Sequence, residues 1–120
     1  MRTVITGLVV SLMAMSAAQA SVDFRAQARC ITAYEVAASL LEVDADAASG
    51  AERAAIRKRI AKLDVNRERL SLALATRTDM TVADSVASQK ERKTEEARLD
   101  KLDAQSVQAI ADACDSMLGG

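Results

Sequence analysis

The chain has 120 residues, a formal net charge of −1 at pH 7, no histidine and only two aromatic residues, Phe24 and Tyr34. A near-neutral charge with so few rings argues against nucleic-acid binding, which needs a basic excess and side chains that stack on bases. Without histidine the chain also lacks the commonest metal ligand and the most frequent general base.

The first twenty residues resemble a secretory signal peptide. Arg2 is the only charged residue among the first 22, an apolar stretch follows it, and residues 18–20 read Ala-Gln-Ala. These are the three parts of a signal peptide, so we predict cleavage between Ala20 and Ser21. An uncleaved anchor is the alternative, but the apolar stretch is shorter than the ~20 residues that a spanning helix needs.

Residues 21–120 are then expected to form one exported domain with no transmembrane segment. Loss of Arg2 leaves this domain with a net charge of −2. Since Ser21 and not cysteine follows the cut, the sequence gives no sign of a lipid anchor. We expect the protein in the periplasm, or otherwise outside the cell.

The composition of this domain predicts an all-α fold. It contains no proline, and its only glycines are Gly50, Gly119 and Gly120. Alanine, leucine, glutamate, lysine, arginine and glutamine dominate it, and all are strong helix formers. Alternating strand patterns are missing, so we expect a small irregular helical bundle.

The two cysteines, Cys30 and Cys114, predict a disulfide, because paired thiols in exported proteins are usually oxidised. On the chain-entropy model a loop of this length contributes about 4–5 kcal/mol of stability. A nucleophilic cysteine would need a base, usually histidine, and none is present. An intermolecular bridge in an antiparallel dimer stays open as an alternative, and the oligomeric state is not predicted.

The first helix is expected over 23–46, with Asp23 as its N-cap. Helical spacing places one apolar stripe on its inner face, formed by Phe24, Ile31, Tyr34, Ala38 and Leu41.

The second helix is expected over 51–77, because Ser49 and Glu52 fit a capping box. Its inner seam contains Arg67 and the apolar residues Ile56, Ile60, Leu63, Leu70 and Leu74.

The third and fourth helices are expected over 81–93 and 95–118. Thr81 and Asp84 resemble a weaker capping pair, with Val82 and Val86 facing inward, and Thr94 would cap the last helix. An even number of passes is favoured because it brings the two cysteines together. Three helices, with a long last helix over 81–118, are the alternative.

No catalytic, cofactor-binding or metal-binding site is expected. Two acidic pairs share helix faces, but we interpret them as solvated surface: Asp100 with Asp103, and Asp112 with Asp115. A basic cluster is also interpreted mainly as a solvated face, with an interaction patch as the alternative; it contains Arg57, Lys58, Arg59, Lys62 and Arg67.

These features favour a small exported protein without catalytic activity. We expect a protein-interaction module of the cell envelope, such as an adaptor, inhibitor or sensor subunit, with another envelope protein as its partner. The alternative is a periplasmic stress chaperone that exposes apolar surface in acid.

Overall fold

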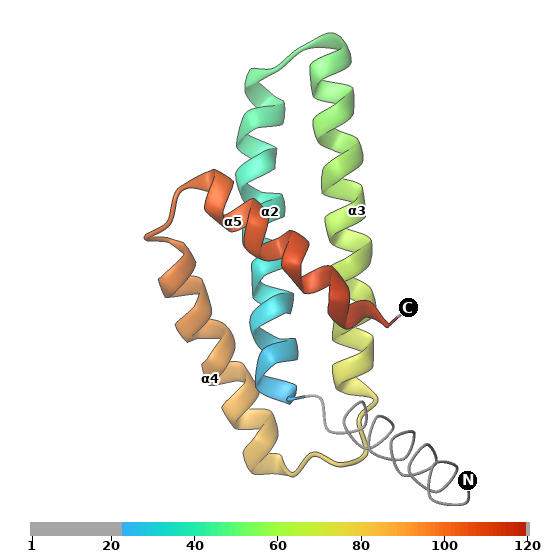
Figure 1. Ribbon diagram of the computed structural model, residues 1–120, viewed down its shortest axis with the longest axis vertical. Coiled ribbons are helices and arrows are strands. Elements are labelled where there is room, and N and C mark those ends of the chain that lie inside the picture. Colours follow the sequence, from blue (N-terminus) through green and yellow to red (C-terminus); the bar gives the residue numbers. More distant parts are fainter. Residues whose placement is uncertain (1–22, 120) are drawn as a thin grey trace, which may run out of the picture.

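The computed structural model describes residues 23–119, and every regular element among them is helical (Figure 1). The predicted signal peptide, 1–20, and its cleavage site between Ala20 and Ser21 lie outside the described residues. The elements are α2 (Phe24–Ala47), α3 (Gly50–Ala75), α4 (Val82–Leu99), α5 (Ala104–Ala113) and a short 3-10 helix, η1 (Cys114–Leu118). The all-α class is therefore confirmed, and so is the number of four α-helices.

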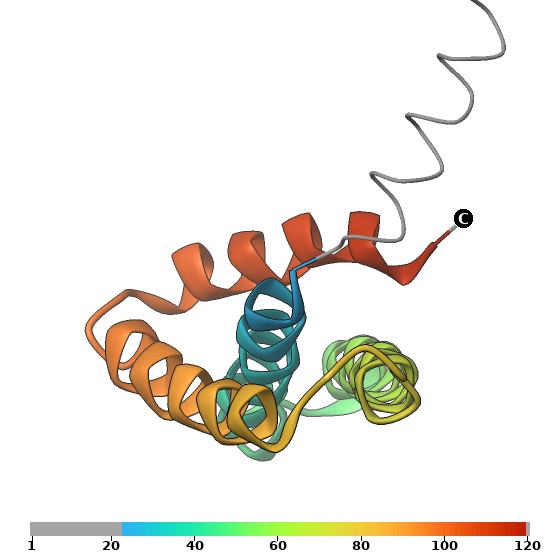
Figure 2. The same cartoon turned by 90° about the horizontal axis from the view of Figure 1, so that it is seen from below.

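Helix α2 is the centre of the bundle. Helices α2 and α3 form a long antiparallel hairpin, α4 packs along α2, and α5 with η1 runs back across α2 at a steep inclination (Figure 1). Viewed from below, α3, α4 and α5 surround α2 on separate sides (Figure 2). The even number of passes brings Cys114 back to the beginning of α2, as the sequence predicts.

Helix starts follow the predicted caps in two of four cases, Asp23 and Thr81. The carboxylate of Asp23 accepts from the backbone N–H of Arg25 at 2.9 Å. Thr81 and Asp84 form a reciprocal capping box at the start of α4. The box predicted at Ser49 is wrong, because Ser49 is the N-cap residue but its side chain makes no capping bond. The next residue, Gly50, has φ of 58°, a conformation that glycine adopts without steric cost.

The predicted break at Thr94 is also wrong. Helix α4 continues through Thr94, whose hydroxyl donates to the carbonyl of Lys90 at 3.0 Å, and ends at Leu99. The chain turns instead at 100–103, where the Asp103 carboxylate accepts from the N–H of Ser106 at 2.7 Å and caps α5. The alternative of one unbroken helix over 81–118 is excluded by the same turn.

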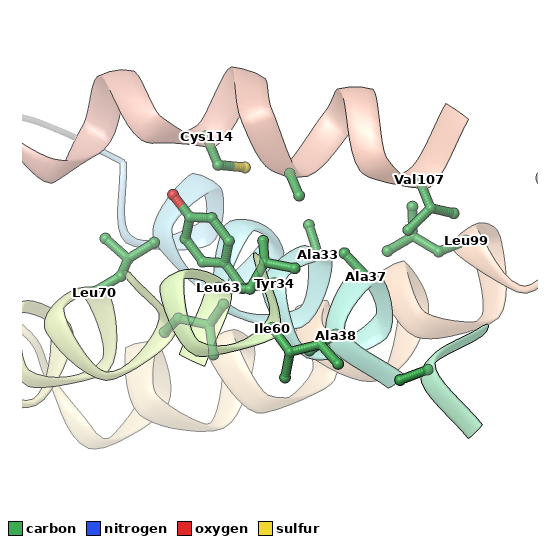
Figure 3. Packing of buried hydrophobic residues seen from close by; sticks show 13 residues of the cluster. Ala33, Tyr34, Ala37, Ala38, Ile60, Leu63, Leu70, Leu99, Val107 and Cys114 are labelled. Atoms are coloured by element: carbon green, nitrogen blue, oxygen red, sulfur yellow. The ribbon is translucent and has the colours of Figure 1, made fainter. Parts of the chain in front are cut away.

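The core is small and rich in alanine. Tyr34 is fully buried between α3 and the end of α5, close to Leu63 and Leu70 (Figure 3). Four alanines of α2 are also fully buried and allow close helix contacts: Ala28, Ala33, Ala37 and Ala45. Leu99 and Val107 fill the space near the α4–α5 turn.

The predicted inner faces are confirmed in α2 and α3. Ile31, Tyr34 and Ala38 are buried on α2, whereas Phe24 and Leu41 are half-buried. On α3 the members Ile60, Leu63 and Leu70 are buried, and Ile56 and Leu74 pack at the edge.

The inward orientation predicted for the start of α4 is wrong. Val82 is 83% exposed and Val86 is 62% exposed. The buried side chains of this helix are Ser88, Glu95 and Leu99, so polar residues set which side of α4 faces α2.

Candidate functional site

The disulfide predicted between Cys30 and Cys114 is present within one chain. Its sulfur atoms are 2.09 Å apart and its Cα atoms 5.6 Å apart, and it joins α2 to the first residue of η1. The intermolecular alternative is therefore wrong. The bond fixes the end of α5 over the beginning of α2.

An open groove lies beside this disulfide. Helices α4 and α5 diverge from their connecting turn, and the first turns of α2 lie behind the space between them (Figure 1). The groove has a volume of about 400 Å³ and mostly apolar walls. Its apolar lining consists of Ala26, the Cys30–Cys114 disulfide, Ile110, Ala113 and Met117. This volume lies within the ~300–1,000 Å³ typical of ligand sites.

Two arginine–glutamate pairs mark the polar edge of the groove. Arg98 binds Glu95 with two hydrogen bonds, one of them 2.8 Å between Nη2 and Oε2. Glu95 is only 5% exposed, and a buried carboxylate of this kind needs such a partner. The bond to Glu95 raises the pKa of Arg98, so this guanidinium stays charged. Arg29 of α2 also lines the groove, and its Nη1 contacts Glu91, one turn before Glu95 on α4, at 3.0 Å.

Polar contacts also hold α4 on α2 outside the groove. Arg92 donates to Glu35 at 2.6 Å and to the hydroxyl of Thr32 at 3.3 Å. Two members of the charged stretch that the sequence places at a turn, Glu91 and Arg92, thus pair with side chains of α2. These pairs explain why α4 continues past Thr94.

A buried polar cluster lies on the other side of the disulfide. The Tyr34 hydroxyl donates to Oδ1 of Asp115 at 2.9 Å, and Nδ2 of Asn66 donates to the same oxygen at 3.3 Å. Burial, followed by the bond to Asp115, raises the pKa of Tyr34. Asp115, which is expected from the sequence to be solvated surface, is thus the acceptor of two side-chain hydrogen bonds. The predicted disulfide could have indicated the contact between Tyr34 and Asp115, because Tyr34 lies one turn after Cys30 and Asp115 directly follows Cys114.

The other acidic residues singled out from the sequence have structural partners or lie in solvent. Asp112 pairs with Arg59 at 3.0 Å, and Asp100 is exposed at the end of α4. The backbone N–H of Ser106 lowers the pKa of Asp103. Among residues 23–119, no group of three or more potential ligands could hold a metal ion.

The structure does not bring the predicted basic cluster together as one patch. Arg57 faces the end of α2 and contacts Glu42 at 2.6 Å and Asp46 at 3.6 Å.

Arg59 points to the opposite side of α3, where it donates to Gln108 at 2.9 Å as well as to Asp112. Lys58 and Lys62 are exposed, and Arg67 is half-buried. The cluster therefore consists of two arginines that bind neighbouring helices and three further side chains, Lys58, Lys62 and Arg67, that do not form one patch with them.

A second hollow lies between α3 and α4 and is more polar than the groove. Serine, glutamine and arginine side chains form more than half of its lining, with Ile31, Leu74 and Met80 among the rest. The groove between α4 and α5 is thus the more apolar of these two concave surfaces.

Helices α2 to α5 include none that combines the length and the apolar character required to cross a membrane. Comparison with known protein families, with curated proteins and with solved structures finds no match.

Proposed function

We propose that this protein is a non-catalytic interaction module of the cell envelope, and that it holds an apolar segment of another envelope protein in the groove between α4 and α5. The observation that carries the proposal is the apolar lining of this groove around the Cys30–Cys114 disulfide. Apolar concave surfaces with a few polar groups at their edges are the usual form of binding sites.

The rim indicates what kind of segment fits. An arginine has five N–H donors. Within residues 23–119, Arg29 uses one of its donors for a side-chain bond and Arg98 uses two. Both guanidinium groups are partly exposed. A segment with apolar side chains in the groove and a carboxylate beside them would use the remaining donors.

The compartment is part of the same proposal. Its supports are the signal-peptide pattern of residues 1–20 and the disulfide, which persists in oxidising compartments. The periplasm is the proposed location.

Site-specific photocrosslinking tests the groove in exporting cells. A photoreactive phenylalanine analogue replaces Ala113, an exposed residue of the groove, or Val43, an exposed residue near the far end of α2. We expect a covalent adduct with a second protein from position 113 and none from position 43. Equal adducts from both positions, or adducts from position 43 alone, would refute docking in the groove.

A periplasmic stress chaperone is the second candidate, and one observation favours it. Two ion pairs, Arg29–Glu91 and Arg92–Glu35, hold α4 on α2, and the first two turns of α4 add no large buried apolar side chain to this contact. Release of α4 would uncover the apolar face of α2. Far-UV circular dichroism and apolar-dye binding from about pH 7 to about pH 2 test this function. Unchanged signals over that range exclude it.

A further inference from the structure

The outer face of α3 carries a second seam, opposite to the one that packs on α2. Six exposed residues follow each other at spacings of four and three: Ala54, Lys58, Ala61, Val65, Glu68 and Leu72. Val65 is 55% exposed and Leu72 is 65% exposed. Within residues 23–119, no other helix covers this side of α3 (Figure 2). The alternation of four and three is the spacing of a helix that packs against another helix.

The two charged members of this seam are not used within the chain. Neither Lys58 nor Glu68 takes part in a hydrogen bond or ion pair within residues 23–119, where the recorded salt bridges use arginine side chains. The remaining members are two alanines, a valine and a leucine, which are exposed to solvent and pack against no other helix of residues 23–119.

The seam is complementary to itself when two copies run antiparallel. If a two-fold axis crosses the outer face of α3 midway between Ala61 and Val65, Lys58 of one copy lies opposite Glu68 of the second copy. Ala54 lies opposite Leu72 of the second copy. Ala61 lies opposite Val65 of the second copy.

Each of these three pairs occurs twice, once on each side of the axis, as an isologous interface requires. A parallel pair would place Lys58 against Lys58 and Glu68 against Glu68.

We propose that the outer face of α3 is a homodimer interface, and that its occupant is a second copy of this chain in antiparallel orientation. The dimer is weak and reversible, because one helix pair with small side chains buries less than the ~1,200 Å² of standard stable interfaces. A dissociation constant on the order of 10–100 µM follows from an interface of this kind. Helix α4, which contributes Glu95 and Arg98 to the groove, lies across α2 from α3 (Figure 2), so a second copy on the outer face of α3 leaves the groove open.

Two residues beside the seam oppose this pairing slightly. Lys62 and Asp64 flank the axis, and each faces its own counterpart in the second copy. Like charges at such exposed positions repel each other only weakly. Two Lys58–Glu68 pairs, which lie within the seam itself, offset them. The interaction is therefore sensitive to charge at positions 58 and 68.

Sedimentation equilibrium of the disulfide-bonded exported chain tests the proposal with charge reversals. K58E and E68K each convert both attractive pairs into repulsive ones, whereas the double variant K58E/E68K restores attraction with the signs exchanged. We expect each single variant to raise the dissociation constant at least about tenfold, since two pairs change sign. The double variant should dimerise about as well as the natural protein, and a mixture of the two single variants should form heterodimers.

Both positions are exposed, so circular dichroism should show an unchanged fold in all variants. A natural protein that stays monomeric at concentrations well above the expected constant overturns the proposal. A dimer that the single variants do not weaken, or that the double variant does not restore, also overturns it.

Discussion

The hydroxyl of Tyr34 in α2 donates a hydrogen bond of 2.9 Å to Asp115 in η1, across a sequence separation of 81 residues. Asn66 of α3 donates to the same oxygen. One carboxylate thus joins the first, second and last helical elements directly behind the disulfide. The bundle is closed there by both a covalent bond and a polar cluster.

Replacement Tyr34→Phe tests the contribution of this hydrogen bond. Its loss should cost about 1 kcal/mol at neutral pH, because Asp115 keeps only Asn66 as a side-chain partner. The pKa of Tyr34 is raised above 10.0 in the folded state, so its contribution is complete below about pH 10 and declines as the pH rises further. Urea unfolding of both proteins between pH 7 and pH 11 should show a difference that narrows above pH 10. A constant difference would contradict this role.

Much of the fold could be predicted because local signals and one covalent constraint agree with it. Composition predicts helices, Asp23 and Thr81 mark two helix starts, and the cysteine pair requires an even number of passes. What could not be predicted depends on contacts between helices. Glu95 is buried and Arg92 bonds to Glu35 of α2, and so α4 extends beyond Thr94.

The groove was likewise hidden from the sequence. Its shape depends on the angle between α4 and α5, which the turn at 100–103 and the disulfide set together. From the sequence, Ile110 and Met117 are recognisable only as members of an apolar helix face, because their place in the groove depends on how α5 crosses α2. The different directions of Arg57 and Arg59, which pair with α2 and α5 respectively, were also not evident from their adjacent positions in the sequence.

Thr81 and Ser49 are both N-cap residues, but only the Thr81 side chain makes a capping bond. Thr81→Ala should cost about 1 kcal/mol of unfolding free energy, since it removes a capping box. Ser49→Ala is the matched control and should change stability little, because the Ser49 side chain makes no capping bond. Chemical denaturation of the two variants measures both values. Equal losses would indicate that Ser49 also caps its helix.

The position of the α4–α5 turn can be tested with two leucines that lie three residues apart. Leu99 is buried in the core, whereas Leu102 is exposed in the turn. Leu99→Ala should therefore cost about 2–5 kcal/mol, and Leu102→Ala much less. Thermal unfolding should rank the variants in that order. If Leu102→Ala were the more harmful change, the turn would lie elsewhere.

The closure of the bundle by one intrachain disulfide supports both the fold and the groove. Protease digestion of the exported protein without reductant, followed by mass spectrometry, tests it most directly. We predict a single cross-linked peptide pair that contains Cys30 and Cys114, recovered from monomeric protein and lost on reduction. Two free thiols per chain, or a bridge between two chains, would contradict the account.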